Sequence, residues 1–402
     1  MWKKTLIIAL LIFCISMPTL AYDEDNENID IEELLETSNE TLNEPNVYSR
    51  AAVVLDRNTK TILYEKNMNE KRAMASTTKI MTAIIALENG NLAEVIEVSR
   101  KAANTGGSRL GLGAGDKITL NDLLYGLLLS SGNDAAVAIA ENIGGSVEEF
   151  AILMNEKTKE LNLKNTNFVT PHGLDAPEHY TTAYELALLA DYAMGNKKFS
   201  EIVNTRSYSV KINNYTKNIN NTNELLGYLE GVNGVKTGFT NDAGRCLVTS
   251  TNRNGFNIIT VVLGADTKKI RTADSIRLIK YTYDTYEKIN LKDIVEKEFL
   301  SYKMKNKIAV LKGIKEKLNY ELNYNIYEYQ PIRKNNIKDL KININTTKEV
   351  NAPIEYGTKV GEIKILLGEE EIMHMEIVSG ENIRKKGIID YMNEIAKFLL
   401  RR

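Results

Sequence analysis

The first residues that could carry chemistry are Ser76-Thr77-Thr78-Lys79, which precede a predicted helix over residues 80–87. A serine and a lysine three residues apart on a helix share one face, so the amine can reach the hydroxyl. If burial or a neighbouring cation keeps Lys79 neutral, it can accept the hydroxyl proton and turn Ser76 into a nucleophile. The helix N-terminus adds partial positive charge where an oxyanion develops. Taken alone, these four residues are more typical of ordinary helix capping.

Two further triplets favour the catalytic interpretation. Ser131-Gly132-Asn133 falls between two apolar helical segments, where Gly132 permits a tight turn. Lys236-Thr237-Gly238 precedes a predicted strand, and Gly238 lets a substrate backbone approach closely. These three kinds of motif, in this order, mark penicillin-binding proteins and class A β-lactamases.

On these motifs, residues 48–290 closely resemble the low-molecular-mass penicillin-binding proteins that act as serine-type D-alanyl-D-alanine carboxypeptidases, peptidase family S11. The resemblance extends beyond the triplets, and the stretches that carry it are 75–82, 131–136, 170–174, 179–180, 234–240 and 243–246. Residues 291–378 resemble the family's β-rich C-terminal domain, less specifically. The implied fold is an α+β, β-lactamase/transpeptidase-like catalytic domain, an antiparallel sheet with helices, followed by a small all-β domain.

The resemblance implies a role for each catalytic residue. Ser76 is the nucleophile that forms an acyl-enzyme, Lys79 is its general base, and Ser131 relays a proton. The backbone N–H groups of Ser76 and Phe239 form the oxyanion hole, which contributes several kcal/mol in such sites.

The same resemblance assigns the substrate-binding residues. Asn133 holds the substrate amide, and Lys236 supplies positive charge that keeps Lys79 neutral and attracts the substrate carboxylate. Thr237 hydrogen-bonds that carboxylate, and Gly238 leaves room beside it. Arg271 matches the arginine that helps to bind the terminal carboxylate; the alternative is a surface cation at a helix start.

The implied substrate is a peptidoglycan pentapeptide stem that ends in D-Ala-D-Ala, which offers a carbonyl to attack and a carboxylate to bind. Acylation followed by deacylation replaces one difficult step with two easier ones. β-Lactams mimic the dipeptide and are expected to remain on the enzyme as covalent adducts. No cofactor is implied.

Two alternatives keep the same fold. A β-lactamase with this triad deacylates with a glutamate in a Glu-x-x-Leu-Asn loop. The Leu-Asn pair here is Leu161-Asn162, and the position of the glutamate, three residues before Leu161, is occupied by Thr158. The interval carries Pro171-His172-Gly173 instead, which disfavours a β-lactamase. A non-catalytic wall-binding or antibiotic-sensing protein is the other alternative, and the three intact motifs argue against it.

A metal hydrolase and a thiol enzyme are also disfavoured. His172, Asp175, Glu178 and His179 are potential ligands, but the chain has only three histidines and no His-x-x-x-His spacing, so the pair is expected to stabilise a loop beside the cleft. Cys246 lies in an apolar strand without an evident partner and is expected to be a small buried hydrophobe.

The composition of the chain excludes some classes of protein. The chain has 402 residues, 43% hydrophobic and 26% charged, which excludes a wholly disordered protein. Its net charge of −2 gives no bulk electrostatic reason to expect nucleic-acid binding.

The N-terminus predicts export. A basic start, an apolar run over residues 5–17 and small residues up to Ala21 form the pattern of a secretory signal, residues 1–21. Residues 22–47 contain ten acids and much Asn, which predicts a disordered acidic leader. The mature protein is therefore expected outside the cytoplasm.

Hydrophobic periodicity outlines the rest of the chain. Strands over 51–55 and 61–64 predict a hairpin, helices follow over 80–87, 123–128, 135–143 and 149–161, and strands return over 246–250 and 258–263. A helix over 272–288 closes the catalytic domain, 48–290, whose sheet is built from both chain ends. Period-two strands over 318–322, 340–344 and 361–365 predict a β-rich domain over 291–380.

The chain ends in an amphipathic segment, 383–402, with six basic residues and Ile388, Met392, Ile395 and Leu399 on one face. We expect this helix to lie in the plane of the membrane surface, on the outer face of the cytoplasmic membrane. The alternative is a helix packed onto the β-rich domain.

Overall fold

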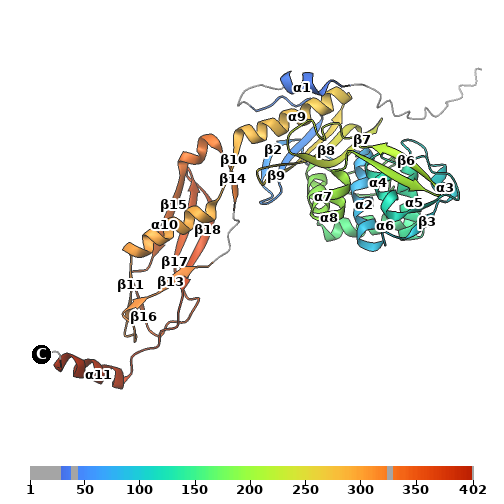
Figure 1. The fold of residues 1–402 in the computed structure, drawn as a ribbon. Coiled ribbons are helices and arrows are strands. Elements are labelled where there is room, and N and C mark those ends of the chain that lie inside the picture. The colour runs from blue at the N-terminus through green and yellow to red at the C-terminus, as the bar shows by residue number, and fades with distance from the viewer. Residues whose placement is uncertain (1–28, 38–43, 324–328, 401–402) are drawn as a thin grey trace, which may run out of the picture.

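The computed structural model describes residues 29–37, 44–323 and 329–400. The predicted signal, residues 1–21, lies outside the described residues. Figure 1 shows a mixed helix-and-sheet body from which a β-rich body extends, with the last helix at its far end. The predicted α+β fold class is confirmed.

A five-stranded antiparallel sheet forms the centre of the catalytic body. Its order is β2-β1-β9-β8-β7, so strands from both ends of the domain meet, as predicted. The strands are β1 (Ala51–Asp56), β2 (Ile62–Lys66), β7 (Val232–Thr240), β8 (Gly244–Arg253) and β9 (Phe256–Ala265). β1 and β2 pair antiparallel, which confirms the predicted hairpin.

Helices cover both faces of this sheet because its strands are apolar on both sides. Val53 and Leu55 of β1 lie in the core that contains α2 (Lys79–Asn89), whereas Ala52 and Val54 lie in the core that contains α9 (Lys268–Thr285). Successive strand residues point to opposite faces, so one strand supplies both cores.

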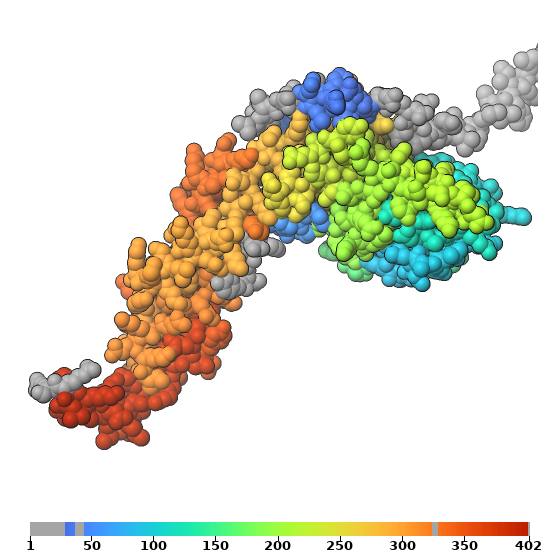
Figure 2. All heavy atoms as spheres, viewed as in Figure 1, coloured from blue at the N-terminus to red at the C-terminus, as the bar shows by residue number. Residues whose placement is uncertain are grey.

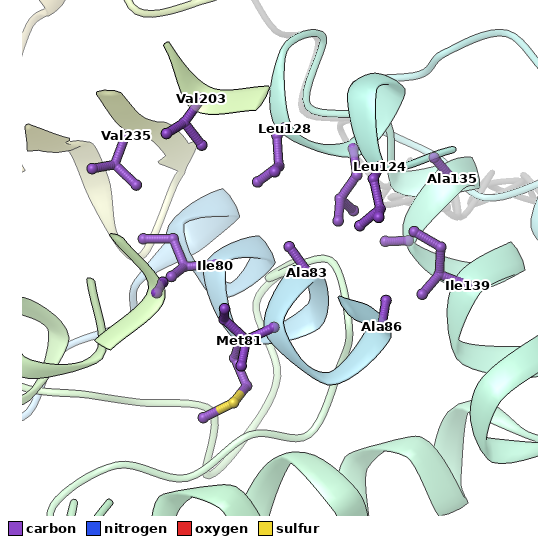
Figure 3. Close-up of a cluster of buried hydrophobic side chains, with 14 of the residues drawn as sticks. Ile80, Met81, Ala83, Ala86, Leu124, Leu128, Ala135, Ile139, Val203 and Val235 are labelled. Atoms are coloured by element: carbon purple, nitrogen blue, oxygen red, sulfur yellow. The ribbon is translucent and has the colours of Figure 1, made fainter. Parts of the chain in front are cut away.

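The α2 side is a helical layer that surrounds the segment carrying Ser76. Figure 3 shows α2 side chains among those of α4 and α5, including Leu124, Leu128, Ala135 and Ile139. The helices of this layer are α3 (Arg100–Ala103), α4 (Leu120–Leu128), α5 (Asn133–Gly144), α6 (Val147–Glu160), α7 (Ala183–Gly195) and α8 (Lys197–Val203). A second antiparallel sheet borders it, in the order β3 (Val95–Glu97), β4 (Lys117–Thr119), β5 (Ser207–Ile212), β6 (Tyr215–Asn220).

Part of the acidic leader is folded, which corrects the prediction of disorder for residues 22–47. Helix α1 (Ile31–Thr37) packs beside α9, and Ile31 and Leu34 are only 7% and 4% exposed. The reason is local: Ile31, Leu34 and Leu35 have helical i, i+3, i+4 spacing and form an apolar face despite the surrounding acids.

The connection to the second body differs from the predicted helix over 272–288. α9 begins earlier and ends at Thr285, and β10 (Tyr286–Ile289) then pairs with β14 (Gln330–Arg333). Helix α10 (Leu291–Lys305) follows and was not predicted. Its buried residues Leu291, Val295 and Phe299 form a narrow stripe in an otherwise charged segment.

The remaining elements of this body are mainly strands. A four-stranded sheet has the order β13 (Tyr320–Leu322), β18 (Glu370–Ser379), β17 (Lys359–Leu367), β15 (Leu340–Thr346). A three-stranded sheet has the order β12 (Lys317–Leu318), β11 (Ile308–Leu311), β16 (Glu349–Asn351), and a short 3-10 helix spans Lys334–Asp339. The predicted strands over 340–344 and 361–365 are present, and that over 318–322 is split at Asn319.

The last helix, α11 (Ile388–Leu399), does not pack on the β-rich body. Ile388, Met392, Ile395 and Leu399 are 62–81% exposed, so the alternative of a packed helix is wrong. Figure 2 shows this helix at the tip of the molecule. Within the part of the chain that the structure describes, no helix is both long and apolar enough to cross a bilayer.

Candidate active site

Ser76 lies in a strained turn at the start of α2. A 3-10 turn, η1 (Ala75–Thr78), leads into the helix, and Ala75 adopts a left-handed φ of +47°. Non-glycine residues in that region are uncommon and cluster at functional sites. Thr77 fixes the turn because its hydroxyl donates to the Met74 carbonyl at 2.6 Å.

Lys79 is fully buried, and its Nζ lies 2.6 Å from Ser76 Oγ. Nζ also donates to Asn133 Oδ1 at 2.7 Å and to the His172 carbonyl at 2.8 Å. Both of these oxygens can only accept, so each takes an N–H of the amine and holds Nζ beside the Ser76 hydroxyl.

Ser131 and Asn133 come from the break between α4 and α5. Ser131 is 5% exposed and has a φ of +59°, which turns the chain sharply before α5. Asn133 Nδ2 donates to the Gly106 carbonyl at 2.7 Å, and this bond orients its Oδ1 toward Lys79. The serine–asparagine triplet is therefore held by backbone contacts from a loop that the sequence did not implicate.

The Lys236-Thr237-Gly238 motif lies in β7, the edge strand beside η1. A Cβ on Gly238 would lie 3.0 Å from Ser76 N and 3.1 Å from Ala75 Cβ, so only glycine lets the strand approach the nucleophile this closely. Lys236 is 1% exposed, and its Nζ donates to the Thr237 carbonyl at 3.0 Å. The hydroxyls of Thr237 and Thr222 lie 2.7 Å apart.

These segments enclose one cleft. Its lining contains six residues of the predicted site together with Ser108 and Thr222: Ser76, Ser131, Thr237, Gly238, Phe239 and Arg271. Lys79 and Asn133 join it through their hydrogen bonds, whereas the buried Lys236 is not among the lining residues.

Several contributors carried no signal in the sequence. Ser108 and Thr222 lie in polar loops without a motif, and the His172 group that contacts Lys79 is a backbone carbonyl. Glu224, which pairs with Arg271, is likewise outside every motif. Only the fold brings these groups to the cleft.

The loop over residues 171–180 braces the site from the other side. His179 Nδ1 accepts from Val169 N at 2.9 Å, so Nε2 carries the proton and donates to Thr78 Oγ1 at 2.8 Å. Burial lowers the pKa of His179 to about 4. Burial is the largest cause that lowers the pKa of His172 to about 3.

The other candidate groups near the cleft have structural positions. Among the described residues, no group of three or more His, Cys, Asp or Glu side chains is placed to hold a metal ion. Asp175 accepts from Thr240 Oγ1 at 2.6 Å and ties the loop to β7. Cys246 is fully buried in the core, and burial raises the pKa of its thiol to about 11.

Comparison with known proteins agrees with this geometry. The family profile described as "D-alanyl-D-alanine carboxypeptidase" matches residues 38–267, more than half of the chain. The chain belongs to the D-alanyl-D-alanine carboxypeptidase family. A second profile, "Penicillin-binding protein 5, C-terminal domain", matches residues 296–385.

Individual relatives cover most of the chain. D-alanyl-D-alanine carboxypeptidase DacF of Bacillus subtilis is 34% identical over 355 residues, 86% of this chain and 88% of that protein. The Escherichia coli enzyme DacC is 31% identical over 370 residues, 87% of each chain. These matches support a serine D-alanyl-D-alanine carboxypeptidase over the alternative of a β-lactamase.

Solved structures show the same fold. The crystal structure of DacD from Francisella tularensis has a TM-score of 0.67 and 30% identity, and the match covers 92% of this chain and 100% of that one. Penicillin-binding protein 5 from Haemophilus influenzae has a TM-score of 0.68 and 25% identity, covering 85% and 99%.

Proposed function

We propose that this chain removes the terminal D-alanine from peptidoglycan stems ending in D-Ala-D-Ala, through an acyl-enzyme on Ser76. The observation that carries the proposal is the 2.6 Å contact between Ser76 Oγ and the buried Lys79 Nζ, at the edge of a cleft lined by Ser131, Thr237 and Arg271. The family of the chain and the names of its relatives support the same reaction.

In acylation, Lys79 Nζ takes the Ser76 hydroxyl proton while Oγ attacks the carbonyl carbon of the penultimate D-alanine. The tetrahedral intermediate then expels the terminal D-alanine, whose nitrogen receives a proton through Ser131. The Ser76 and Phe239 N–H groups are positioned at the developing oxyanion, where such donors contribute most. The result is an ester between Ser76 and the shortened stem.

In deacylation, a water molecule loses its proton to Lys79 and attacks the ester carbonyl, and Ser76 recovers its hydroxyl proton. The released stem ends in a single D-alanine. A β-lactam acylates Ser76 in the same way, but its leaving group stays attached to the adduct.

The substrate is held at both sides of the reacting bond. Thr237 and Arg271, which both line the cleft, bind the terminal carboxylate, and the buried Lys236 next to Thr237 adds positive charge. Asn133 holds the substrate amide next to Lys79. β7 ends the sheet order, so an extended peptide can align along it.

The test is D-alanine release from a synthetic pentapeptide stem by the wild type, Ser76→Ala and Ser130→Ala. Ser130 is the matched control, because its hydroxyl donates to the Gly126 carbonyl and it does not line the cleft. Release is expected from the wild type and Ser130→Ala but not from Ser76→Ala. A wild type that binds penicillin without releasing D-alanine would support a non-catalytic sensor instead.

The second part of the proposal concerns location. The signal pattern over residues 1–21 supports export, and the exposed apolar face of α11 with its basic neighbours supports binding to the outer face of the cytoplasmic membrane. Co-sedimentation with anionic vesicles tests this. Ile388→Ser with Met392→Ser is expected to abolish co-sedimentation, whereas Leu300→Ser with Met304→Ser, at equally exposed positions of α10, is expected to leave it unchanged.

A further inference from the structure

Arg271 reaches the cleft from α9 with most of its donors uncommitted. The side chain is 1% exposed and lines the cleft with Ser76 and Thr237. Its Nη2 donates to Glu224 Oε1 and, at 3.4 Å, to Thr272 Oγ1, while its buried Nε meets no acceptor among the described residues. A guanidinium with unused donors suits a carboxylate ligand, provided that something fixes its orientation.

Glu224 is the group that fixes it. Its side chain is 16% exposed, and Oε1 accepts from both Arg271 Nη2 and Thr272 Oγ1. Burial favours the neutral acid, but Arg271 and the Thr272 hydroxyl outweigh burial and lower the pKa of the Glu224 carboxyl. Glu224 is therefore a charged counterion that uses only one edge of the guanidinium.

The segment that carries Glu224 is itself anchored. Asn223 Nδ2 donates to the Gly234 carbonyl of β7 at 2.9 Å, and Asn221 Nδ2 donates to the Val203 carbonyl at 3.1 Å. Thr222, between the two, lies in hydroxyl contact with Thr237. Residues 221–224 thus contact both groups that the proposed function assigns to the substrate carboxylate.

We propose that Glu224 is a positioning residue that holds the Arg271 guanidinium at the carboxylate end of the cleft and makes cleavage selective for peptides with a free terminal carboxylate. The inference rests on the proposed function, which supplies the role of Arg271. Glu224 also lines a separate hollow together with Arg206 and Tyr228.

The test compares two substrates. One is an acylated peptide ending in D-Ala-D-Ala, and the other is an acyl-D-alanyl thioester whose leaving group is uncharged. In Glu224→Gln, KM for the peptide is expected to rise about ten- to a hundred-fold, the usual effect of weakening one charge-assisted hydrogen bond. Its kcat for the peptide, and its kcat/KM for the thioester, are expected to change less than about three-fold, within the tolerance of a site whose reacting groups are intact.

Glu230→Gln is the matched control, because that carboxylate is 84% exposed and lies outside the cleft. If Glu224→Gln is too unstable to assay, Glu224→Asp keeps the charge but withdraws it by one methylene, and a smaller rise in KM is expected. An unchanged or lower KM for the peptide, or an equal loss on both substrates, overturns the inference. A wild type that cleaves the thioester but not the peptide overturns the proposed function instead.

Discussion

The catalytic cleft and the terminal helix α11 depart from the usual distribution of side chains in opposite directions. In and around the cleft, Lys79, Lys236 and Arg271 are at most 1% exposed, although such residues normally face water. In α11, Ile388 and Met392 are 81% and 64% exposed, although such residues normally face a core. The buried basic side chains need fixed polar partners to compensate for their lost hydration. An exposed apolar face of this kind is typical of a surface that contacts another molecule or a membrane.

The two regions are therefore expected to respond differently to substitution. In the cleft, each polar group is held by others, so a single change alters both packing and chemistry. In α11, the apolar side chains are exposed and contribute little to the stability of the folded body.

Removal of the buried amine should have the largest effect. Lys79→Met deletes the proposed base and leaves the Asn133 and His172 acceptors without their donor. The rate of acylation by a fluorescent penicillin is expected to fall about 10²- to 10⁴-fold, the usual contribution of a positioned base. Lys101→Met, at an exposed lysine, should not change the rate; a fast Lys79→Met enzyme would exclude Lys79 as the base.

The second prediction separates close packing from backbone strain. Gly173 and Gly145 have φ values of +87° and +80°, but a Cβ on Gly173 would lie 1.9 Å from the Ala75 carbonyl, and one on Gly145 would touch nothing. Gly145→Ala is expected to cost about 1 kcal/mol through strain alone. Gly173→Ala should cost several-fold more and slow penicillin acylation, because it displaces η1. Equal melting temperatures for the two variants would refute this account of the loop.

The third prediction concerns acid stability. The pKa of His179 is about 4 when folded, against an ordinary 6.5, so between these values the unfolded chain binds a proton that the folded chain does not. Stability is therefore fully present above pH 6.5 and is lost as the pH falls toward 4, by up to about 3 kcal/mol for such a shift.

Urea unfolding at several pH values measures how the free energy of unfolding changes with pH. His179→Asn keeps an acceptor near Val169 N and should flatten the slope, while His374→Gln, at an exposed histidine of β18, should not. If His179→Asn leaves the pH dependence of the free energy of unfolding unchanged, other groups cause the loss of stability in acid.

A pair of truncations compares the stability contributions of the two regions, and the change in α11 has the smallest expected effect. Ile84→Ala, in the fully buried face of α2, is expected to lower the free energy of unfolding by about 2–5 kcal/mol. Ile388→Ala should lower it by less than about 0.5 kcal/mol, because that side chain is already exposed. A large loss from Ile388→Ala would mean that α11 packs on the protein in solution.

Local sequence predicted those parts of the structure whose signal is local. The Ser76–Lys79 spacing alone places the amine beside the hydroxyl, and Thr119 caps α4 by accepting from Asp122 N at 3.1 Å, as its spacing indicates. Strand β1 was recognisable because its first five residues are apolar, and all six of its residues are buried.

The remainder depends on contacts between distant segments. Glu224 meets Arg271 across 47 positions of sequence, and nothing around either residue indicates the other. Helices α1 and α10 were not predicted because their apolar stripes are short and lie among charged residues. The charged composition of these segments obscured the helical spacing of their few apolar residues. Their burial depends on α9 and on the β-rich body, which no short window of sequence contains.

The most direct measurement is intact-protein mass spectrometry after brief exposure to benzylpenicillin, with peptide mapping of the adduct. A single covalent adduct on Ser76 is predicted, with none formed by Ser76→Ala and a normal yield from Ser130→Ala. An adduct on any other residue, or an undiminished yield from Ser76→Ala, would contradict the assignment of Ser76 as the nucleophile.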